Sequence, residues 1–146
     1  MRARATDVAY VALGSNVGHR GEALARLRHA LERDGVTIEA ASGEVLTRPV
    51  GVTAQGDFHN QVVRLRSPEP WPPEAWLAHS RTAEIEAGRR STYRWGPRRA
   101  DADILLLGEH GDVQVDTQAL TVPHRELRNR PFLIELLSEL DPSLTP

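Results

Sequence analysis

Two chemically reactive residue types are missing from this chain of 146 residues, which contains no cysteine and no lysine; all 18 of its basic residues are arginine. Without cysteine the protein forms no disulfide, has no thiol nucleophile and holds no cysteine-ligated zinc. Without lysine it has neither the lysine of a P-loop nor a Schiff-base lysine. These absences exclude several common classes of enzyme before any motif is considered.

Long apolar runs are missing as well. No stretch approaches the roughly 20 apolar residues of a membrane span, and the N-terminus does not resemble a signal peptide. We therefore expect a cytoplasmic protein without a membrane partner. Hydrophobic residues make up 40% and charged residues 26% of the chain, which predicts one globular domain over residues 1–146. The net charge of −2 argues against a general nucleic-acid-binding surface.

Hydrophobic patterning and turn residues divide the chain into short elements. We expect strands at 7–14, 36–48 with a break near Gly43, 58–67, 101–108 and 113–116, and helices at 20–34, 73–87 and 131–140. The connections are a turn at 14–16, a loop at 49–57, a proline-rich link at 68–73, a helix-ending Gly88, an arginine-rich loop at 89–99 and a turn around 123–124. This order predicts an α+β fold, a ferredoxin-like sandwich with a mainly antiparallel sheet and flanking helices.

Charge is concentrated where the arginine-rich loop meets the strand at 101–108. Five arginines precede two aspartates there: Arg89, Arg90, Arg94, Arg98, Arg99, Asp101 and Asp103. Residues i and i+2 of a strand face the same side, about 6.6 Å apart, so the two carboxylates can share Mg²⁺ ions. Alternatively, they are two solvated acids at a strand edge.

The neighbouring arginines indicate what such a site would bind. Guanidinium groups bind phosphate oxygens, so arginines beside metal-binding carboxylates suit a nucleoside triphosphate with Mg²⁺ or a nucleic-acid backbone. A solvated basic loop that neutralises the acids is the alternative. The segment Gly14-Ser15-Asn16-Val17-Gly18 looks superficially like a phosphate-binding turn, but alone it indicates a strand-to-helix turn. A nucleic-acid-binding module or a metal-dependent nuclease is the competing class.

Four segments, in this order, resemble one known family. They are "YVALGSNVG" (10–18), "TRPVGVTAQGDFHNQVV" (47–63), "RWGPRRADADILLLG" (94–108) and "LTVPHRELRNRPFLIELLSEL" (120–140). Together they resemble the 6-hydroxymethyl-7,8-dihydropterin pyrophosphokinases of folate biosynthesis. The resemblance implies a ferredoxin-like fold and transfer of pyrophosphate from ATP to the pterin, which gives AMP.

The same resemblance implies roles for individual residues. Catalysis would involve Arg89, Arg90, Arg94, Arg98, Asp101 and Asp103, and the two aspartates would hold two Mg²⁺ ions. ATP would bind to Glu84, Arg94, Trp95, Arg98, Ile104, His124 and Arg130. The pterin would bind to Thr47, Val50, Phe58, Asn60, Trp95, Asp101 and Phe132. The implied partners are these two small molecules alone, bound by a monomer that does not associate with nucleic acid.

Each of these residue types also has an ordinary structural role. Phe58 and Phe132 are the only phenylalanines and could be core residues, Asn60 a satisfied strand residue and His124 a turn residue. It is their joint occurrence in the family's order that favours the functional interpretation. Three arginines depart from the family's usual residues, namely Arg48, Arg81 and Arg125.

Overall fold

The computed structural model describes residues 3–15, 22–47, 58–89 and 100–144. Its elements are β1 (Thr6–Ser15), α1 (Glu22–Leu31), β2 (Thr37–Ala41), β3 (Val45–Thr47), β4 (Phe58–Trp71), α2 (Pro73–Arg89), β5 (Ala100–Leu107), β6 (Val115–Asp116), β7 (Thr121–Val122), a 3-10 turn (Leu127–Asn129) and α3 (Pro131–Leu140). Within the described ranges, no helix has both the length and the apolar character needed to cross a membrane.

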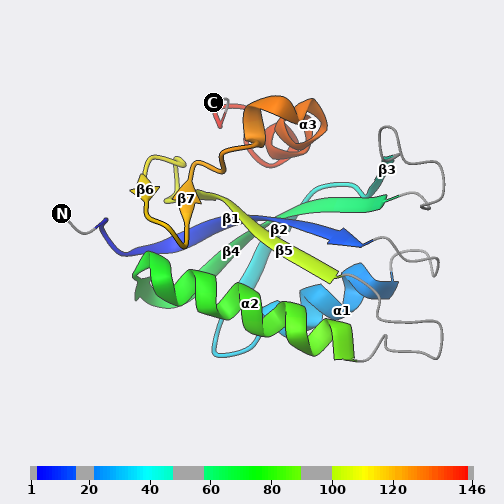
Figure 1. Ribbon diagram of the computed structural model, residues 1–146, viewed down its shortest axis with the longest axis horizontal. Helices are drawn as coiled ribbons and strands as arrows, with labels where there is room; N and C mark the ends of the chain where they lie inside the picture. Colours follow the sequence, from blue (N-terminus) through cyan, green and yellow to red (C-terminus); the bar gives the residue numbers. More distant parts are fainter. Residues whose placement is uncertain (1–2, 16–21, 48–57, 90–99, 145–146) are drawn as a thin grey trace.

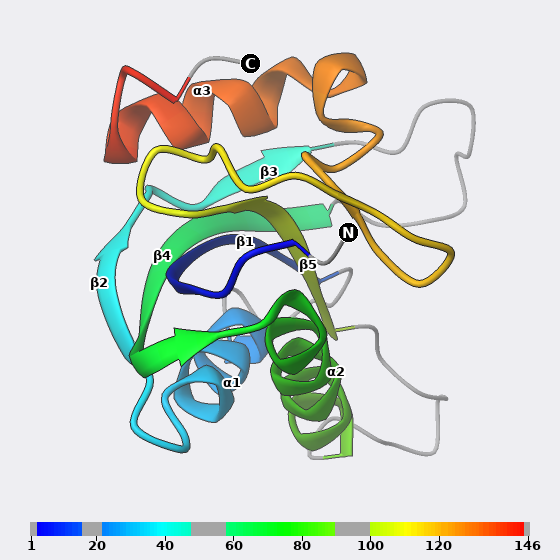
Figure 2. The same ribbon diagram turned by 90° about the vertical axis from the view of Figure 1, so that its left-hand side faces the viewer.

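The main sheet has the strand order β2-β4-β1-β5, and β3 also pairs with β4. Every pair in it is antiparallel. Helices α1 and α2 cover one face of the sheet, and α3 lies over the other (Figure 1). Figure 2 shows the same three layers from another side, with β1 between β4 and β5. This arrangement confirms the predicted ferredoxin-like α+β sandwich.

Because successive side chains of a strand point to opposite faces, the sheet has a hydrophobic core on each face. In β1, Ala9, Val11 and Leu13 pack with α1 and α2. The intervening residues Val8, Tyr10 and Ala12 pack with α3. Because successive side chains of a strand point to opposite faces, a continuous apolar run is what a strand buried on both sides requires. The same rule puts Asp101 and Asp103 on one face of β5, which is an edge strand of the sheet.

Three predicted ends of elements in the N-terminal half are wrong. Helix α1 ends at Leu31, three residues before its predicted end at residue 34. Strand β1 continues to Ser15, one residue past the predicted strand 7–14, so it takes in the first two residues of the predicted turn at 14–16. Strand β4 continues to Trp71 through the stretch predicted as a proline-rich link. Its pairing with β1 jumps from Arg66 to Trp71 across a bulge. Prolines are tolerated in such an irregular stretch because no ladder hydrogen bond is required from them.

The predicted end of the second helix is also wrong. Helix α2 runs to Arg89, so Gly88 lies inside its last turn and does not end it. A glycine that ends a helix usually adopts a positive φ, and Gly88 is not among the glycines of the described residues that do so.

The remaining predictions are confirmed in whole or in part. The break near Gly43 separates β2 from β3, and α3 spans the predicted residues. The predicted hairpin partner of β5 is correct only at Val113, which forms an isolated bridge with Leu107. Val115 and Asp116 form β6 and pair with β7 instead.

Candidate active site

Two predicted site residues, Asn60 and Asp101, lie in one row across the sheet with Gly14 between them. Gly14 of β1 lies opposite Asn60 of β4 on one side and opposite Asp101 of β5 on the other. Neighbouring strands are about 4.8 Å apart, so Asn60 and Asp101 are separated by about 10 Å, and Gly14 contributes no side chain between them. The row belongs to the α3 face, because Ala12, two residues before Gly14, packs in the core on that face. A polar amide and a carboxylate thus border a bare strip of backbone.

The ring of Phe58 covers part of this strip. A Cβ atom on Gly14 would come 2.8 Å from Cε1 of Phe58, closer than side chains normally approach. Phe58 is half-buried, so its ring is not enclosed in the core. Phe132, at the start of α3, is also half-buried and packs against the core on the same face. That both rings bind the pterin remains a prediction.

Asn60 is buried and held in a defined orientation. Its Nδ2 donates to Oγ1 of Thr47 at 2.9 Å and to the carbonyl oxygen of Phe58 at 3.1 Å. Both amide hydrogens are thereby used. Its Oδ1 lies 3.8 Å from the position that a Cβ on Gly14 would occupy, so an acceptor borders the bare strip. Thr47, predicted to bind the pterin, therefore orients Asn60 through its hydroxyl.

The two aspartates are half-buried on the same face of β5, and Asp103 lies opposite Ala12 of β1. Carboxylate oxygens are the ligands that Mg²⁺ prefers, and Mg²⁺ sites use one or two carboxylates together with substrate phosphates. Among the described residues, no cluster of three or more histidines and carboxylates could hold a metal. Two carboxylates are a number that suits such a Mg²⁺ site, and the metal itself remains a prediction.

Glu84 of α2 binds the backbone between the two aspartates. Its Oε2 accepts a hydrogen bond from the amide of Ala102 at 2.8 Å, and its Oε1 pairs with Arg81 at 3.0 Å. Burial raises the pKa of the Glu84 carboxyl; the Ala102 hydrogen bond and Arg81 oppose this increase, and the charge of Asp103 adds to it. Because β5 is an edge strand, this contact also satisfies an amide that has no strand partner.

A pocket of about 360 Å³ opens beside this edge of β5. It is lined by Leu77, Arg81, Ala102, Asp103, Ile104, Gln118, Ala119, Leu120, Thr121, His124, Arg125 and Glu126. The amide of His124 donates to the carbonyl of Leu105 at 3.0 Å, which fixes this wall to the strand. Nδ1 of His124 accepts from the amide of Glu126 at 3.1 Å, so the neutral ring carries its proton on Nε2 and can donate it to a ligand.

The pocket brings together two of the residues predicted to bind ATP, Ile104 and His124, with the predicted metal ligand Asp103. Glu84 and Arg130 are not among its lining residues; Arg130 is exposed and directly precedes α3. The nucleotide roles of Glu84 and Arg130 stay predictions.

Three residues of the candidate site were not predicted as site residues: Arg81, Arg125 and Gly14. Arg81 and Arg125 line the pocket, although the sequence singled them out only as departures from the family pattern. Gly14 had been attributed to a turn. The sequence indicated Gly14 only through its place in the segment "YVALGSNVG". Its missing side chain matters because Asn60 and Asp101 lie opposite it on the two neighbouring strands.

Several predicted residues cannot be placed. Val50, Arg90, Arg94, Trp95 and Arg98 lie outside the described residues, and Arg89 is described only as the last residue of α2. Their predicted roles in phosphate and pterin binding therefore stay predictions.

Comparison with known proteins identifies the family. The model of the 7,8-dihydro-6-hydroxymethylpterin-pyrophosphokinase family matches residues 10–142. The chain belongs to this family. The matched span of the pyrophosphokinase family includes the row of Asn60, Gly14 and Asp101 and the lining of the pocket beside β5.

Individual pyrophosphokinases show the same similarity. The 2-amino-4-hydroxy-6-hydroxymethyldihydropteridine pyrophosphokinase of Bacillus subtilis is 37% identical over 136 residues, 92% of this chain and 78% of the relative. The enzyme of the same name from Methylorubrum extorquens is 34% identical over 137 residues, 93% of this chain and 84% of the relative. The mitochondrial folate synthesis bifunctional protein of Arabidopsis thaliana is 33% identical over 130 residues, 89% of this chain but 23% of that longer protein.

Proposed function

We propose that this protein transfers the β,γ-pyrophosphoryl group of ATP to the hydroxymethyl group of 6-hydroxymethyl-7,8-dihydropterin and releases AMP. Membership of the pyrophosphokinase family supports the reaction. The observation that carries the proposal for this chain is the position of the two aspartates. Asp101 shares a row with Gly14 and Asn60, and Asp103 lines the pocket at the edge of β5. The carboxylates therefore lie between two candidate ligand surfaces.

The pterin would occupy the bare strip over Gly14. Gly14 contributes no side chain to this surface, the half-buried ring of Phe58 lies beside it, and we expect the flat pterin ring to stack on Phe58. Oδ1 of Asn60 accepts hydrogen bonds at the edge of the strip, and the ring edge of a pterin carries N–H donors. This orientation directs the other end of the pterin across the strip toward Asp101.

ATP would bind with its base in the pocket beside β5 and its phosphates toward the aspartates. The pocket volume of about 360 Å³ lies within the range of small-ligand sites. Nε2–H of His124 and the guanidinium groups of Arg81 and Arg125 offer donors to ribose or phosphate oxygens. Asp101 and Asp103 would hold two Mg²⁺ ions, which, when bound, offset phosphate charge and align the phosphates for displacement.

The chemistry is an in-line displacement in which positioning carries most of the effect. The hydroxyl oxygen of the pterin forms a bond to the β-phosphorus and gives up its proton to water. The bond from that phosphorus to the α,β-bridging oxygen breaks, so AMP leaves. Arg89, Arg90, Arg94 and Arg98 would neutralise the charge that develops on the phosphates and on AMP. Glu84 contributes indirectly, because it holds the segment of β5 that carries both aspartates.

The direct test is product analysis. The protein is incubated with ATP, Mg²⁺ and 6-hydroxymethyl-7,8-dihydropterin, and nucleotides and pterins are separated by chromatography. We expect AMP and pterin diphosphate in equal amounts, with no AMP when the pterin is omitted. Formation of ADP, or of AMP independent of the pterin, would contradict the proposal.

Four finer features belong to the same proposal. We propose that residues 1–146 form a single domain, that the enzyme acts as a monomer in the cytoplasm, and that it does not bind nucleic acid. The row and the pocket are built from one chain, and the net charge of −2 disfavours a nucleic-acid partner. Light scattering in the presence and absence of MgATP would test the monomer, and a shift to a dimer mass would contradict it.

A further inference from the structure

Strand β3 pairs with β4 in a register that is shifted by one residue from the end of β2. Ala41, the last residue of β2, lies opposite Val63. Val45, the first residue of β3, lies opposite Asn60. Between these two pairs the outer strand has three residues, 42–44, whereas β4 has two. Residues 42–44 thus form a β-bulge, a feature that often lies beside active sites and redirects a side chain there.

This bulge decides which residue of β3 shares a face with Asn60. Residues directly opposite each other in an antiparallel pair point to the same face, and a shift by one residue exchanges the two faces. Thr47 lies opposite Phe58, on the face of Asn60, and its Oγ1 accepts from Nδ2 of Asn60 at 2.9 Å. Without the extra residue, Leu46 would lie opposite Phe58 and Thr47 would point to the face that α1 and α2 cover.

Gln61 of β4 holds the bulge from the side of α1. It follows Asn60 in the strand, so its side chain points to the opposite face. Gln61 is buried, and its Nε2 donates to the carbonyl oxygen of Ser42 at 2.8 Å. The backbone of Val62 adds two contacts, since its amide donates to Oγ of Ser42 at 2.9 Å and its carbonyl accepts from the amide of Ser42 at 2.8 Å. These hydrogen bonds fix the first residue of the bulge to β4.

Arg28 of α1 orients the amide group of Gln61. Its Nη1 donates to Oε1 of Gln61 at 2.6 Å. A guanidinium group only donates hydrogen bonds, so this contact fixes which end of the amide is turned to Ser42. The same nitrogen lies 3.6 Å from Oε2 of Glu44, the last residue of the bulge. Arg28 and Gln61 together therefore contact both ends of the bulge.

We propose that Gln61 is a positioning residue for pterin recognition. By holding the bulge, it fixes the register in which β3 brings Thr47 to Asn60. A strand of three residues has few ladder contacts of its own, so its register depends on such support. This inference rests on the proposed function. Gln61 points away from the candidate pterin surface, and the pocket beside β5 is built from other elements, so Gln61 should influence the affinity for the pterin and not for ATP.

Two substitutions remove this support without changing Thr47 or Asn60. Gln61→Met keeps the length of the side chain and removes both of its hydrogen bonds. Arg28→Met removes only the contacts with Gln61 and Glu44. Loss of one hydrogen bond such as that between Thr47 and Asn60 corresponds to roughly a three- to tenfold change in Kd. We expect a rise of this size for Gln61→Met, and a smaller one for Arg28→Met, in a fluorescence titration with 6-hydroxymethylpterin, whereas the Kd for MgATP should not change.

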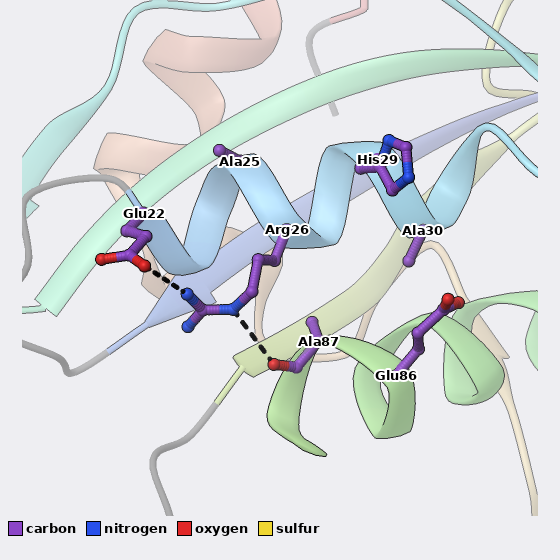
Figure 3. A pocket seen from close by; sticks show the side chains of 7 residues that line it. All are labelled: Glu22, Ala25, Arg26, His29, Ala30, Glu86 and Ala87. Atoms are coloured by element: carbon purple, nitrogen blue, oxygen red, sulfur yellow. Dashed lines mark hydrogen bonds and ion pairs between the residues drawn. The ribbon is translucent and has the colours of Figure 1, made fainter. Parts of the chain in front are cut away.

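Arg26→Met is the matched control for Arg28→Met. The two arginines belong to the same helix, and their side chains are 15% and 29% exposed. Figure 3 shows Arg26 on the flank of α1 that faces α2, where its Nε donates to the carbonyl oxygen of Ala87 and its Nη1 pairs with Glu22. Arg26→Met loses the same charge on the side away from the bulge, so it should keep the wild-type Kd for the pterin.

A double-mutant cycle separates positioning from a general loss of stability. If Gln61 acts through Thr47, Gln61→Met should have little further effect in a Thr47→Val background, where the supported hydrogen bond is already absent. Losses that multiply in the double variant, or an unchanged pterin Kd for Gln61→Met, would overturn the proposal. Gln61→Glu keeps an acceptor for Arg28 and loses only the donor to Ser42, so it gives the same comparison if Gln61→Met does not fold.

Cross-strand nuclear Overhauser effects report the register without any ligand. The wild type should show contacts between Thr47 and Phe58, and Gln61→Met should weaken them or replace them with contacts between Leu46 and Phe58. Unchanged cross-strand contacts in Gln61→Met would contradict the inference. If the wild type binds no pterin, the proposed function fails, whereas these contacts still decide whether Gln61 fixes the register of β3.

Discussion

The ring of Phe58 lies so close to Gly14 that a Cβ atom at residue 14 would come 2.8 Å from Cε1 of that ring. Gly14 is also the middle residue of the row that has Asn60 and Asp101 at its ends. A glycine in a strand weakens it, and it often marks a place where a ligand approaches the backbone. The account of pterin binding depends on this bare position.

Gly14→Ala should weaken pterin binding, because the added methyl group forces the Phe58 ring to move and fills part of the strip. Stacking on an aromatic ring contributes about 1–3 kcal/mol, so we expect roughly a tenfold higher Kd for the pterin. Gly43→Ala is the matched control, since a Cβ there would meet only Glu139 at an ordinary 3.7 Å. Fluorescence titration gives both constants. Equal pterin affinity in the two variants would show that the strip is not the binding surface.

Thr47→Val should weaken pterin binding through Asn60. The variant keeps the shape of the side chain but removes the oxygen that accepts from Nδ2 of Asn60 at 2.9 Å. A hydrogen bond of this kind contributes about 0.5–1.5 kcal/mol, so we expect roughly a three- to tenfold rise in Kd. Thr47→Ser retains the hydroxyl and should stay near the wild type in the same titration. A larger loss for Thr47→Ser than for Thr47→Val would indicate that the methyl group matters and the hydroxyl does not.

Asp101→Asn and Asp103→Asn should each lower the transfer rate sharply. Each variant keeps the size of the side chain and removes a charge that a Mg²⁺ ion needs, and metal stabilisation of a transferring phosphate contributes several kcal/mol, so a loss of roughly 100-fold or more is expected. Pterin affinity should be largely retained, because Asn60 and Phe58 belong to β4. Rates measured across a Mg²⁺ titration check this. Full activity of either variant would exclude the two-carboxylate metal site.

Glu84→Gln should make stability less dependent on pH. Burial raises the pKa of Glu84 above its ordinary value of 4.5, so the folded state binds this proton more tightly than the unfolded chain does. The resulting stability is fully present below pH 4.5 and is lost as the pH rises through the higher folded-state pKa. The free energy of unfolding of Glu84→Gln, relative to the wild type, should therefore increase as the pH rises from 4.5 toward neutrality. Urea unfolding at several pH values measures this difference, and a constant difference would argue against a shifted Glu84.

The fold could largely be predicted because its elements have local signals. The apolar run of β1 and the helical periodicity of α3 each specify which faces must be buried. The errors arose where tertiary structure overrides local preference. The prolines at 68 and 70 lie in β4, where the bulge against β1 removes the need for their missing amides. The glycine at 88 remains helical inside α2, next to Ala87, whose carbonyl accepts a hydrogen bond from Arg26.

The candidate site could be predicted as a set of residues but not as an arrangement. The spacing of Asp101 and Asp103 already implies one shared face of a strand. The row through Asn60, Gly14 and Asp101 depends on how three strands distant in sequence align, which no local pattern contains. Likewise, the contact of Glu84 with the amide of Ala102 requires α2 to pack beside the open edge of β5.

The central claim is that the aspartates of β5 lie between a pterin on the Gly14 strip and a nucleotide in the pocket at the strand edge. A crystal structure with Mg²⁺, 6-hydroxymethylpterin and a non-transferable α,β-methylene analogue of ATP tests it most directly. The account predicts the pterin stacked on Phe58 with its edge at Oδ1 of Asn60, metal on Asp101 and Asp103, and the nucleotide base in the pocket that includes Ile104 and His124. A pterin bound away from Gly14, or phosphates without metal contact to either aspartate, would contradict it.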